Sequence, residues 1–300
     1  MNKENSCPVC RSSEKKRIGK PMSNPTSEKF LRYDFNVVQC KACQTFYVDP
    51  LIDFTPDEWK QLYNSGYFGY NTEWLINQRE KDLQHRFSLL DKMKSGGEVN
   101  FLDIGCGEGN ALMHAVKRNW NATAVDITDL RKPAAKNNPA IKFIESDLPG
   151  AGLAADTYNV AYLDSVLEHV LNPLEYLNEI KRILAPGGIV YIGIPNEDSL
   201  LNTARKLAFL LKGRSGYSVK LRPFDAPYHV VGFNNSSANN IIRKAGLKKV
   251  YFRNFGRKFD FLGFKPGTFE YFQALAMLPV EFLGWAFRKD NYFEMILRKE

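Results

Sequence analysis

The stretch FLDIGCGEGN at residues 101–110 joins a short apolar segment to a loop that has glycine at every second position. Glycines let a ligand approach the backbone, and a helix after such a loop offers unpaired N–H groups. From residue 99 onward, short apolar runs alternate with helical patterns, which predicts an α/β fold with a doubly wound, mostly parallel sheet. We expect strands at 99–104, 121–126, 141–144, 158–163 and 188–194, and helices at 109–119, 129–137, 172–184 and 198–212.

Local signals refine this plan. Pro133 makes the second helix doubtful or limits it to a single turn, because proline in a helix interior removes a hydrogen bond and disfavours the helix. A Pro-Gly-Gly turn at 186–188 is expected to end the helix before the fifth strand. A helix near 237–244, stopped at Gly246, precedes a sixth strand, and residues 291–299 form the last strand.

The composition of the glycine loop indicates which nucleotide it binds. Asn110 stands where the dinucleotide fingerprint requires its third glycine, and Asp103 and Glu108 would both repel a pyrophosphate. A ligand with an ammonium and a sulfonium would be attracted to Asp103, and its carboxylate could still accept hydrogen bonds from loop N–H groups. This chemistry describes S-adenosylmethionine.

Two acids follow later strands of the expected sheet. Asp126 ends the second strand, at about the 20-residue spacing that places an acid on a ribose diol, a feature that dinucleotide sites share. Asp147 follows the third strand. Because parallel sheets bind ligands beyond the C-terminal ends of their strands, we expect the glycine loop, Asp126 and Asp147 to meet at one site.

Four of the five cysteines form two C-x2-C pairs, Cys7 with Cys10 and Cys40 with Cys43. Two such pairs can bind one tetrahedral zinc ion through four thiolates, which leaves the metal a structural role. The 29 residues between the pairs must then fold out as a hairpin, and the segments around the second pair resemble strands. Two disulfides or a redox motif are the alternatives, although a reducing compartment and the lack of a surrounding βαβ pattern argue against them.

The bulk composition, with 44% hydrophobic and 25% charged residues, is that of a globular protein. The formal charge of +8 favours an anionic partner, but an ordinary basic enzyme accounts for it equally well. The N-terminal stretch is polar, so we expect no signal peptide and a cytoplasmic protein. The apolar stretch at 269–287 is interrupted by Glu270, Gln273, Pro279 and Glu281, and we expect no transmembrane helix.

Five motifs in order, LDIGCGEG, VDI, IESDLP, VLEHVLNP and ILAPGGIVYIGIPN, resemble the class I S-adenosylmethionine-dependent methyltransferases over about residues 63–299. The N-terminal CPVC and CKACQTFYVDP are similar to the zinc-binding head of many bacterial methyltransferases that act on sugars, surface glycans and other small molecules. The resemblance implies a Rossmann-like, seven-stranded, mostly parallel sheet whose antiparallel last strand lies beside the fifth or sixth. It also implies a zinc-ribbon-like head at 1–55 and a methyltransferase domain at 56–300, with lid or insert segments at about 200–235 and 256–290.

The same resemblance implies a set of cofactor contacts. The methionine part would lie at Asp103 and the three glycines, the ribose at Asp126, and the adenine at Asp147. Cys106, inside the loop, is otherwise expected to be a small buried residue. The implied cofactor-binding residues are Asp103, Gly105, Cys106, Gly107, Gly109, Asp126, Ile127, Asp147, Leu148, Asp164 and Ser165.

Methyl transfer to a hydroxyl or amine benefits from a base, and two of the four histidines are candidates. His169 follows the fourth strand, and His229 lies in a polar loop suited to a substrate lid. Each could equally be a structural histidine. The stretch LEHV also resembles quinone O-methyltransferases, in which a more acidic version binds a divalent metal. Ser165 replaces one of those carboxylates, so Asp164, Glu168 and His169 could form only a weak site.

Acceptor specificity is expected from the head and from residues 60–80, 200–235 and 256–290. Aromatic faces suit sugar rings and basic groups suit phosphate, although such residues usually pack or face solvent. The helix at 198–212 could face the core or, together with 269–287, rest on a membrane surface. The residues concerned are Tyr63, Tyr67, Phe68, Tyr70, Trp74, Arg205, Lys206, Lys212, Arg214, Lys220 and Arg222.

Three functions remain open on the sequence. The favoured one is a methyltransferase acting on a sugar, nucleotide-sugar or surface-glycan precursor. An RNA methyltransferase that grips nucleic acid with a basic zinc head ranks second, because the basic residues are dispersed. A non-catalytic cofactor-binding scaffold ranks third.

Overall fold

The computed structural model describes residues 6–19, 29–52, 54–63, 72–211, 229–256 and 259–300. Its main sheet has seven strands in the order β10-β11-β8-β7-β4-β5-β6, which confirms the predicted α/β architecture. β11 is antiparallel to both neighbours and lies between β8 and β10, the fifth and sixth strands of this sheet along the chain. The strands are β4 (Asn100–Ile104), β5 (Asn121–Asp126), β6 (Ile141–Glu145), β7 (Tyr158–Asp164), β8 (Leu184–Pro195), β10 (Lys248–Phe255) and β11 (Tyr292–Arg298).

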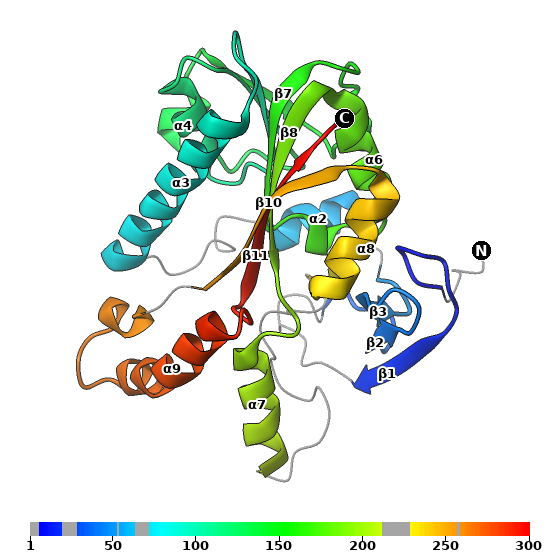
Figure 1. Ribbon diagram of the computed structural model, residues 1–300, viewed down its shortest axis with the longest axis vertical. Helices are drawn as coiled ribbons and strands as arrows, with labels where there is room; N and C mark the ends of the chain where they lie inside the picture. Colours follow the sequence, from blue (N-terminus) through cyan, green and yellow to red (C-terminus); the bar gives the residue numbers. More distant parts are fainter. Residues whose placement is uncertain (1–5, 20–28, 53, 64–71, 212–228, 257–258) are drawn as a thin grey trace.

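Helices cover both faces of this sheet (Figure 1). On one face lie α3 (Glu73–Met93) and α4 (Asn110–Val116), which bury Phe87 and Leu112 against the strands. On the other lie α6 (Pro173–Ile183) and α8 (Asn235–Ala245), which bury Leu177 and Ile241. The sheet is therefore buried on both faces, as a doubly wound fold requires.

The local signals identified in the sequence mostly hold. α5 (Pro133–Lys136) is a single turn that begins at Pro133, and α8 ends at Gly246, which adopts the left-handed conformation typical of a helix C-cap. The Pro-Gly-Gly sequence, by contrast, was wrongly expected to be a turn ahead of the fifth strand. β8 already begins at Leu184, and these residues form an irregular part of it, where the pairing with β7 shifts register.

The C-terminal ends of the parallel strands are surrounded by short elements and two longer helices, α7 (Leu200–Leu211) and α9 (Phe269–Ala286), drawn in the lower half of Figure 1. The short elements are α2 (Pro56–Leu62), η1 (Pro149–Ala151), η2 (Leu167–His169) and η3 (Asp260–Gly263). Among the described residues, no helix has both the length and the apolar character needed to cross a lipid bilayer.

The N-terminal head contains a second, antiparallel sheet in the order β1-β2-β3-β9. β1 (Lys15–Gly19), β2 (Asn36–Cys40) and β3 (Phe46–Asp49) come from the head, and the two later ones flank the second cysteine pair as expected. β9 (Val231–Gly232) comes from far along the chain and pairs with Tyr47 and Phe46. The head is thus bonded to the segment that follows His229.

Candidate active site

The glycine loop takes a conformation that only glycine adopts without strain. Gly105, Gly107 and Gly109 have φ of 69°, 48° and 78°, in the left-handed region. A Cβ atom on Gly105 would lie 2.5 Å from a methyl carbon of Val166, and one on Gly109 would lie 2.8 Å from Cβ of Ala135. The loop is therefore held close to its neighbours, with its backbone facing a pocket of about 1370 Å³ at the ends of the strands.

Asp103 lies beneath the loop at the end of β4 and is only 3% exposed. Its Oδ2 atom has no hydrogen-bond partner among the described residues, although the residue lines the pocket. Burial, reinforced by the charges of Asp126 and Asp164, raises the pKa of Asp103 well above its usual range. A buried carboxyl of this kind suits a cationic ligand group. Glu108 differs, because it forms an ion pair with Lys132 at 2.9 Å.

Asp126 ends β5 beside the glycine loop. One carboxylate oxygen accepts a hydrogen bond from the backbone N–H of Gly107 at 2.9 Å. Burial raises its pKa, and N–H groups from Gly107, Thr128 and Ile127 partly offset that effect. The same carboxylate therefore fixes the loop and faces the pocket.

The pocket brings together most of the residues expected to contact a cofactor. Gly109 and Leu148 are the exceptions, and Leu148 is fully buried in the core beneath Asp147. Cys106 is buried and lines the pocket, and burial raises the pKa of its thiol. The residues that line the pocket are Asp103, Gly105, Cys106, Gly107, Asp126, Ile127, Asp147, Asp164 and Ser165.

Both candidate histidines line the same pocket, where they form an edge-to-face pair with ring centroids 4.8 Å apart. Glu168 lies beside them, and ligand atoms of the three residues lie within 4.8 Å of one another. The Glu168 side chain is 1% exposed, and burial raises its pKa to about 8. Neither of its oxygens has a hydrogen-bond partner among the residues that the structure describes. Two imidazoles and a buried carboxyl therefore share one corner of the pocket.

A buried ionic network next to Asp164 was not predicted from the sequence. Arg86 of α3 contacts Asp164 from Nη1 at 2.5 Å and donates from Nε to Glu294 of β11 at 2.8 Å. Arg253 of β10 pairs with the other oxygen of Glu294. In the sequence, Arg86 resembles any arginine on a helix, and only its distant partners reveal its role.

The four head cysteines converge, as the two C-x2-C pairs predicted. Their sulfur atoms all lie within 4.8 Å of one another, with Cys7 3.5 Å from Cys43 and Cys10 3.4 Å from Cys40. None of the four forms a disulfide. A hydrogen bond from Cys7 lowers the pKa of Cys43 to about 5, despite burial. Four sulfurs around one point are the donor set of a structural zinc site, with a spacing close to that around a tetrahedral ion.

Comparison with known proteins places this site in a family. Residues 75–251 match the family model described as a methyltransferase domain, which is more than half of the chain. The match includes the glycine loop, Asp126, Asp147, Asp164 and His169, and it ends in β10.

Two curated relatives match parts of the chain. A tRNA N(3)-methylcytidine methyltransferase from Schizosaccharomyces pombe is 30% identical over 151 residues, or 44% of this chain and 47% of that protein. A ubiquinone biosynthesis O-methyltransferase from Parvibaculum lavamentivorans is 28% identical over 149 residues, or 48% of this chain and 57% of that protein. The chain thus spans about half the length of these relatives.

Among solved structures, the 1,6-didemethyltoxoflavin-N1-methyltransferase of Burkholderia thailandensis, with bound S-adenosylhomocysteine, superposes with a TM-score of 0.50. It is 15% identical, and the match covers 88% of this chain and 95% of that one, so the likeness extends to the fold alone. The family model, which matches more than half of the chain, shows that the chain belongs to the methyltransferase domain family.

Proposed function

We propose that this protein transfers the methyl group of S-adenosylmethionine to a sugar, nucleotide-linked sugar or surface-glycan precursor. The observation that carries the proposal is one pocket that holds a buried carboxyl without a described partner, Asp103, and the histidine pair of His169 and His229. The Asp103 carboxyl suits a cationic cofactor, and the histidine pair suits an acceptor that must lose a proton.

The cofactor would be held by groups already arranged for it. Asp103 would accept from its ammonium, the glycine loop would donate to its carboxylate, and Asp126 would accept from the ribose diol. Asp147 would contact the adenine with its side chain, whereas Leu148 could contribute only its backbone, since its side chain is buried elsewhere. When bound, the sulfonium supplies a methyl group that is already activated, so the protein mainly aligns the acceptor and excludes water.

His229 and His169 would remove the acceptor's proton. Histidine is the side chain that most often acts as a general base. Burial raises the pKa of the neighbouring Glu168 carboxyl to about 8, and the ligand atoms of the three residues lie within 4.8 Å of one another. Two imidazoles at one corner of the pocket suit general-base catalysis of a hydroxyl or an amine.

The proposed acceptor class follows from the residues beside the histidines. Trp59 and Tyr63 of the α2 region stack at 5.5 Å, and Tyr63 meets His169 edge-on at 5.6 Å. All three line the pocket, as does the cation Arg79, whereas Lys60, which also lines it, forms an ion pair with Glu145 at 2.6 Å. Aromatic faces suit a sugar ring, and an arginine suits the phosphates of a nucleotide-linked sugar. Tyr67, Phe68, Tyr70, Lys212, Arg214, Lys220 and Arg222, also expected to contribute, lie outside the described residues.

The head would bind zinc in a structural role, because all four tetrahedral positions would be filled by protein thiolates. Reduced thiols of this kind fit a cytoplasmic protein.

A second candidate is an RNA methyltransferase, which the similarity to the tRNA methyltransferase favours. Two basic side chains of the head argue against it, because they pair with acids: Arg11 with Glu175 at 3.1 Å, and Arg32 with Glu58 at 2.6 Å. Paired cations are less available to phosphates. A non-catalytic cofactor-binding scaffold is the third reading. It would bind the cofactor in the same pocket, so the measurement that excludes it is methyl transfer to an acceptor.

The first experiment is calorimetric titration of the purified protein with S-adenosylmethionine and S-adenosylhomocysteine, with NADH as control. Saturable binding of the first two alone supports the proposal, and binding of NADH alone refutes it. Screening of sugar nucleotides for methyl transfer follows, with His169→Ala and His229→Ala as test variants. Both should lose turnover and keep cofactor affinity, and wild-type rates in both would exclude the histidines as bases. Salt-sensitive binding of RNA would favour the second candidate.

A further inference from the structure

We propose that α7, η3 and α9 together form a surface that rests on a bilayer containing acidic lipids. We call it the apolar surface. Its lipid contact is independent of the catalytic proposal, but the consequence for the acceptor rests on it. The surface consists of Leu207 and Leu211 of α7, Leu262 and Phe264 at η3, and Phe269, Phe272, Leu275, Phe282, Leu283, Trp285 and Phe287 along α9, all between 39% and 80% exposed.

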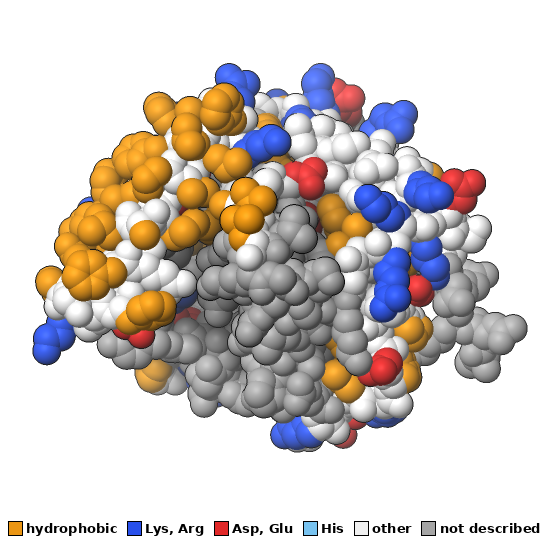
Figure 2. All heavy atoms as spheres, turned by 90° about the horizontal axis from the view of Figure 1, so that it is seen from below, with side chains coloured by type: hydrophobic (Ala, Val, Ile, Leu, Met, Phe, Trp, Pro, Cys, Tyr) orange, Lys and Arg blue, Asp and Glu red, His pale blue; other side chains and the backbone are white. Residues whose placement is uncertain are grey.

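Most of the apolar side chains of α9 face away from the core. Of its 18 residues, only Gly284 is buried. The exposed apolar residues recur at Phe269, Phe272, Leu275, Phe282 and Leu283, which is the spacing of a single helix side. That side faces outward, and Figure 2 shows hydrophobic side chains gathered over one rounded part of the molecule. A group of exposed apolar side chains on one side of a helix marks a contact surface.

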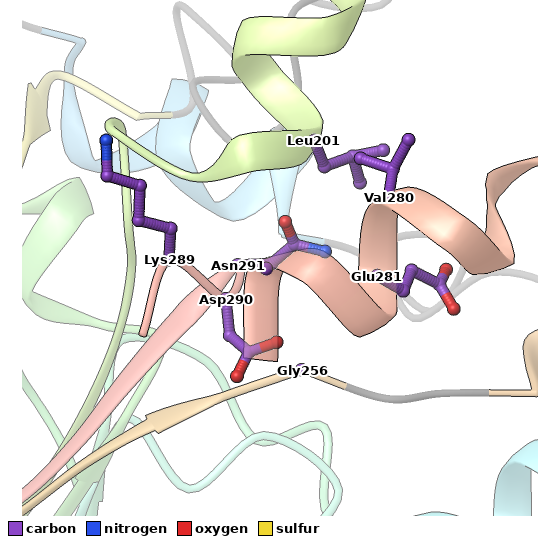
Figure 3. A pocket seen from close by; sticks show the side chains of 8 residues that line it. Leu201, Gly256, Val280, Glu281, Lys289, Asp290 and Asn291 are labelled. Atoms are coloured by element: carbon purple, nitrogen blue, oxygen red, sulfur yellow. The ribbon is translucent and has the colours of Figure 1, made fainter. Parts of the chain in front are cut away.

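The inner side of α9 is firmly attached to the fold. Figure 3 shows Val280 of α9 and Leu201 of α7 pointing toward one another, and Asp290 lying beside Gly256. A Cβ atom on Gly256 would lie 2.8 Å from Oδ1 of Asp290, and one on Gly284 would lie 3.2 Å from the carbonyl oxygen of Lys289. These glycines allow the helix to approach the end of the sheet closely. The exposed apolar side chains of α9 are therefore carried by a helix that is packed firmly against the rest of the fold.

Charge and side-chain type indicate lipid as the occupant. Lys265, Arg288 and Lys289 flank α9 and are exposed, and among the side chains whose exposure the structure describes on α9 and beside it, Glu270 is the one exposed acid. Lys and Arg side chains also lie along the edge of the patch in Figure 2. Exposed Trp and Phe side chains with basic neighbours are found on helices that lie in the interface of an acidic membrane. The whole chain, at +8, would be attracted to such a membrane.

The elements that carry the apolar surface border the candidate active site. Leu201 at the start of α7, Phe255 at the end of β10 and Gly256, which follows it, line the large pocket. A protein resting on lipid through α7 and α9 would turn this pocket toward the bilayer. If the proposed methyl transfer is correct, the acceptor would then be a sugar attached to a lipid, with its polar part entering the pocket.

The test is flotation of the full-length protein with vesicles of phosphatidylcholine alone and of an equal mixture of phosphatidylcholine and phosphatidylglycerol. It needs neither cofactor nor acceptor, so its failure would leave the catalytic proposal untouched. We expect binding to the mixed vesicles and little to the neutral ones. The double variant Phe269→Ser/Phe272→Ser should bind at least about tenfold more weakly, because burying one such ring is worth about a factor of ten or more. Circular dichroism and cofactor titration would verify that this variant is folded.

A matched pair of charge variants tests the basic flank. Lys265→Glu should weaken binding to the mixed vesicles several-fold. Lys92→Glu makes the same change at an exposed position of α3, outside the apolar surface, and should have at most half that effect. The proposal fails if the wild type ignores acidic vesicles, or if the double variant binds as well as the wild type. It also fails if the wild type does not float and is a dimer in solution, while the double variant is a monomer. The apolar surface would then bind a second copy of the chain.

Discussion

Arg86 of α3 meets Asp164 at the end of β7 across 2.5 Å, so a helix that covers the sheet fixes a carboxylate of the candidate active site. The same guanidinium binds Glu294 of β11 and the hydroxyl of Tyr162. Only 9% of the Arg86 side chain and 1% of the Glu294 side chain are exposed. Buried charges are tolerated only when each is paired, so α3, β7 and β11 are constrained together.

Arg86→Lys should therefore act on both stability and turnover. Lysine keeps the charge but cannot bond Asp164, Tyr162 and Glu294 from one planar group. We expect the free energy of unfolding to fall by about 2 kcal/mol. The kcat for the acceptor should fall about tenfold, with cofactor affinity nearly unchanged. Denaturant unfolding measures the stability, calorimetry measures the cofactor affinity, and a methyl-transfer assay measures kcat. Arg11→Lys is the control, because Arg11 and Glu175 are both more than half exposed and their pair contributes little. Equal behaviour of the two variants would refute the positioning role of Arg86.

Cofactor binding should release a proton from Asp103. Burial raises the pKa of this carboxyl, so the free protein keeps it protonated to a higher pH than usual. An incoming ammonium favours the charged form, and affinity should therefore rise with pH until Asp103 ionises in the free protein as well. Calorimetry in buffers of different ionisation enthalpy counts the released protons.

Asp103→Asn is the matching variant, because it cannot ionise. It should release no proton and bind S-adenosylmethionine about tenfold to a hundredfold more weakly. In the wild type without ligand, a raised pKa favours the protonated form, so stability declines as pH rises through that pKa. The variant should lack this decline. Proton release from the variant equal to that of the wild type would assign it to another group.

Asp126→Ala tests the ribose assignment. It removes the acceptor for the Gly107 N–H and for the diol together, and we expect affinity for S-adenosylmethionine to fall about a hundredfold. Asp91→Ala is the control, since Asp91 lies on the exposed side of α3 and pairs with Arg118. Titration of both variants gives the comparison, and an unchanged affinity in Asp126→Ala would mean that the diol binds elsewhere.

Features that depend on neighbouring residues could be predicted from the sequence. The glycine loop and the apolar strands are local patterns, and Pro133 and Gly246 mark helix ends through their own backbone preferences. The two C-x2-C pairs likewise predicted that four sulfurs would meet. Only the family resemblance predicted that the last strand, β11, would lie beside the fifth or the sixth strand, because the order of strands in a sheet leaves no local signal in the sequence.

Features that depend on distant partners could not be predicted. Arg86 lies 78 residues from Asp164 and 208 from Glu294, so no spacing links them. β9 is two residues long, too short to leave a periodic pattern, yet it attaches the head to the loop of His229. The burial of Glu168, which raises its pKa, also follows from tertiary packing alone.

Removal of the zinc ion that we propose for the head should disturb His229 and spare the cofactor. The N–H of Val48 in β3 donates to the carbonyl of Val230 at 3.0 Å, and the N–H of Val230 donates to the carbonyl of Glu168 at 2.9 Å. The head thus fixes the residue next to His229, whereas Asp103 and Asp126 lie on β4 and β5. After chelation, or in Cys43→Ser, we expect the imidazole NMR signals of His229 to shift, turnover to fall about tenfold or more, and cofactor affinity to stay within about twofold. Zinc should restore the chelated protein. Unshifted signals, or an equal loss of cofactor affinity, would contradict this coupling.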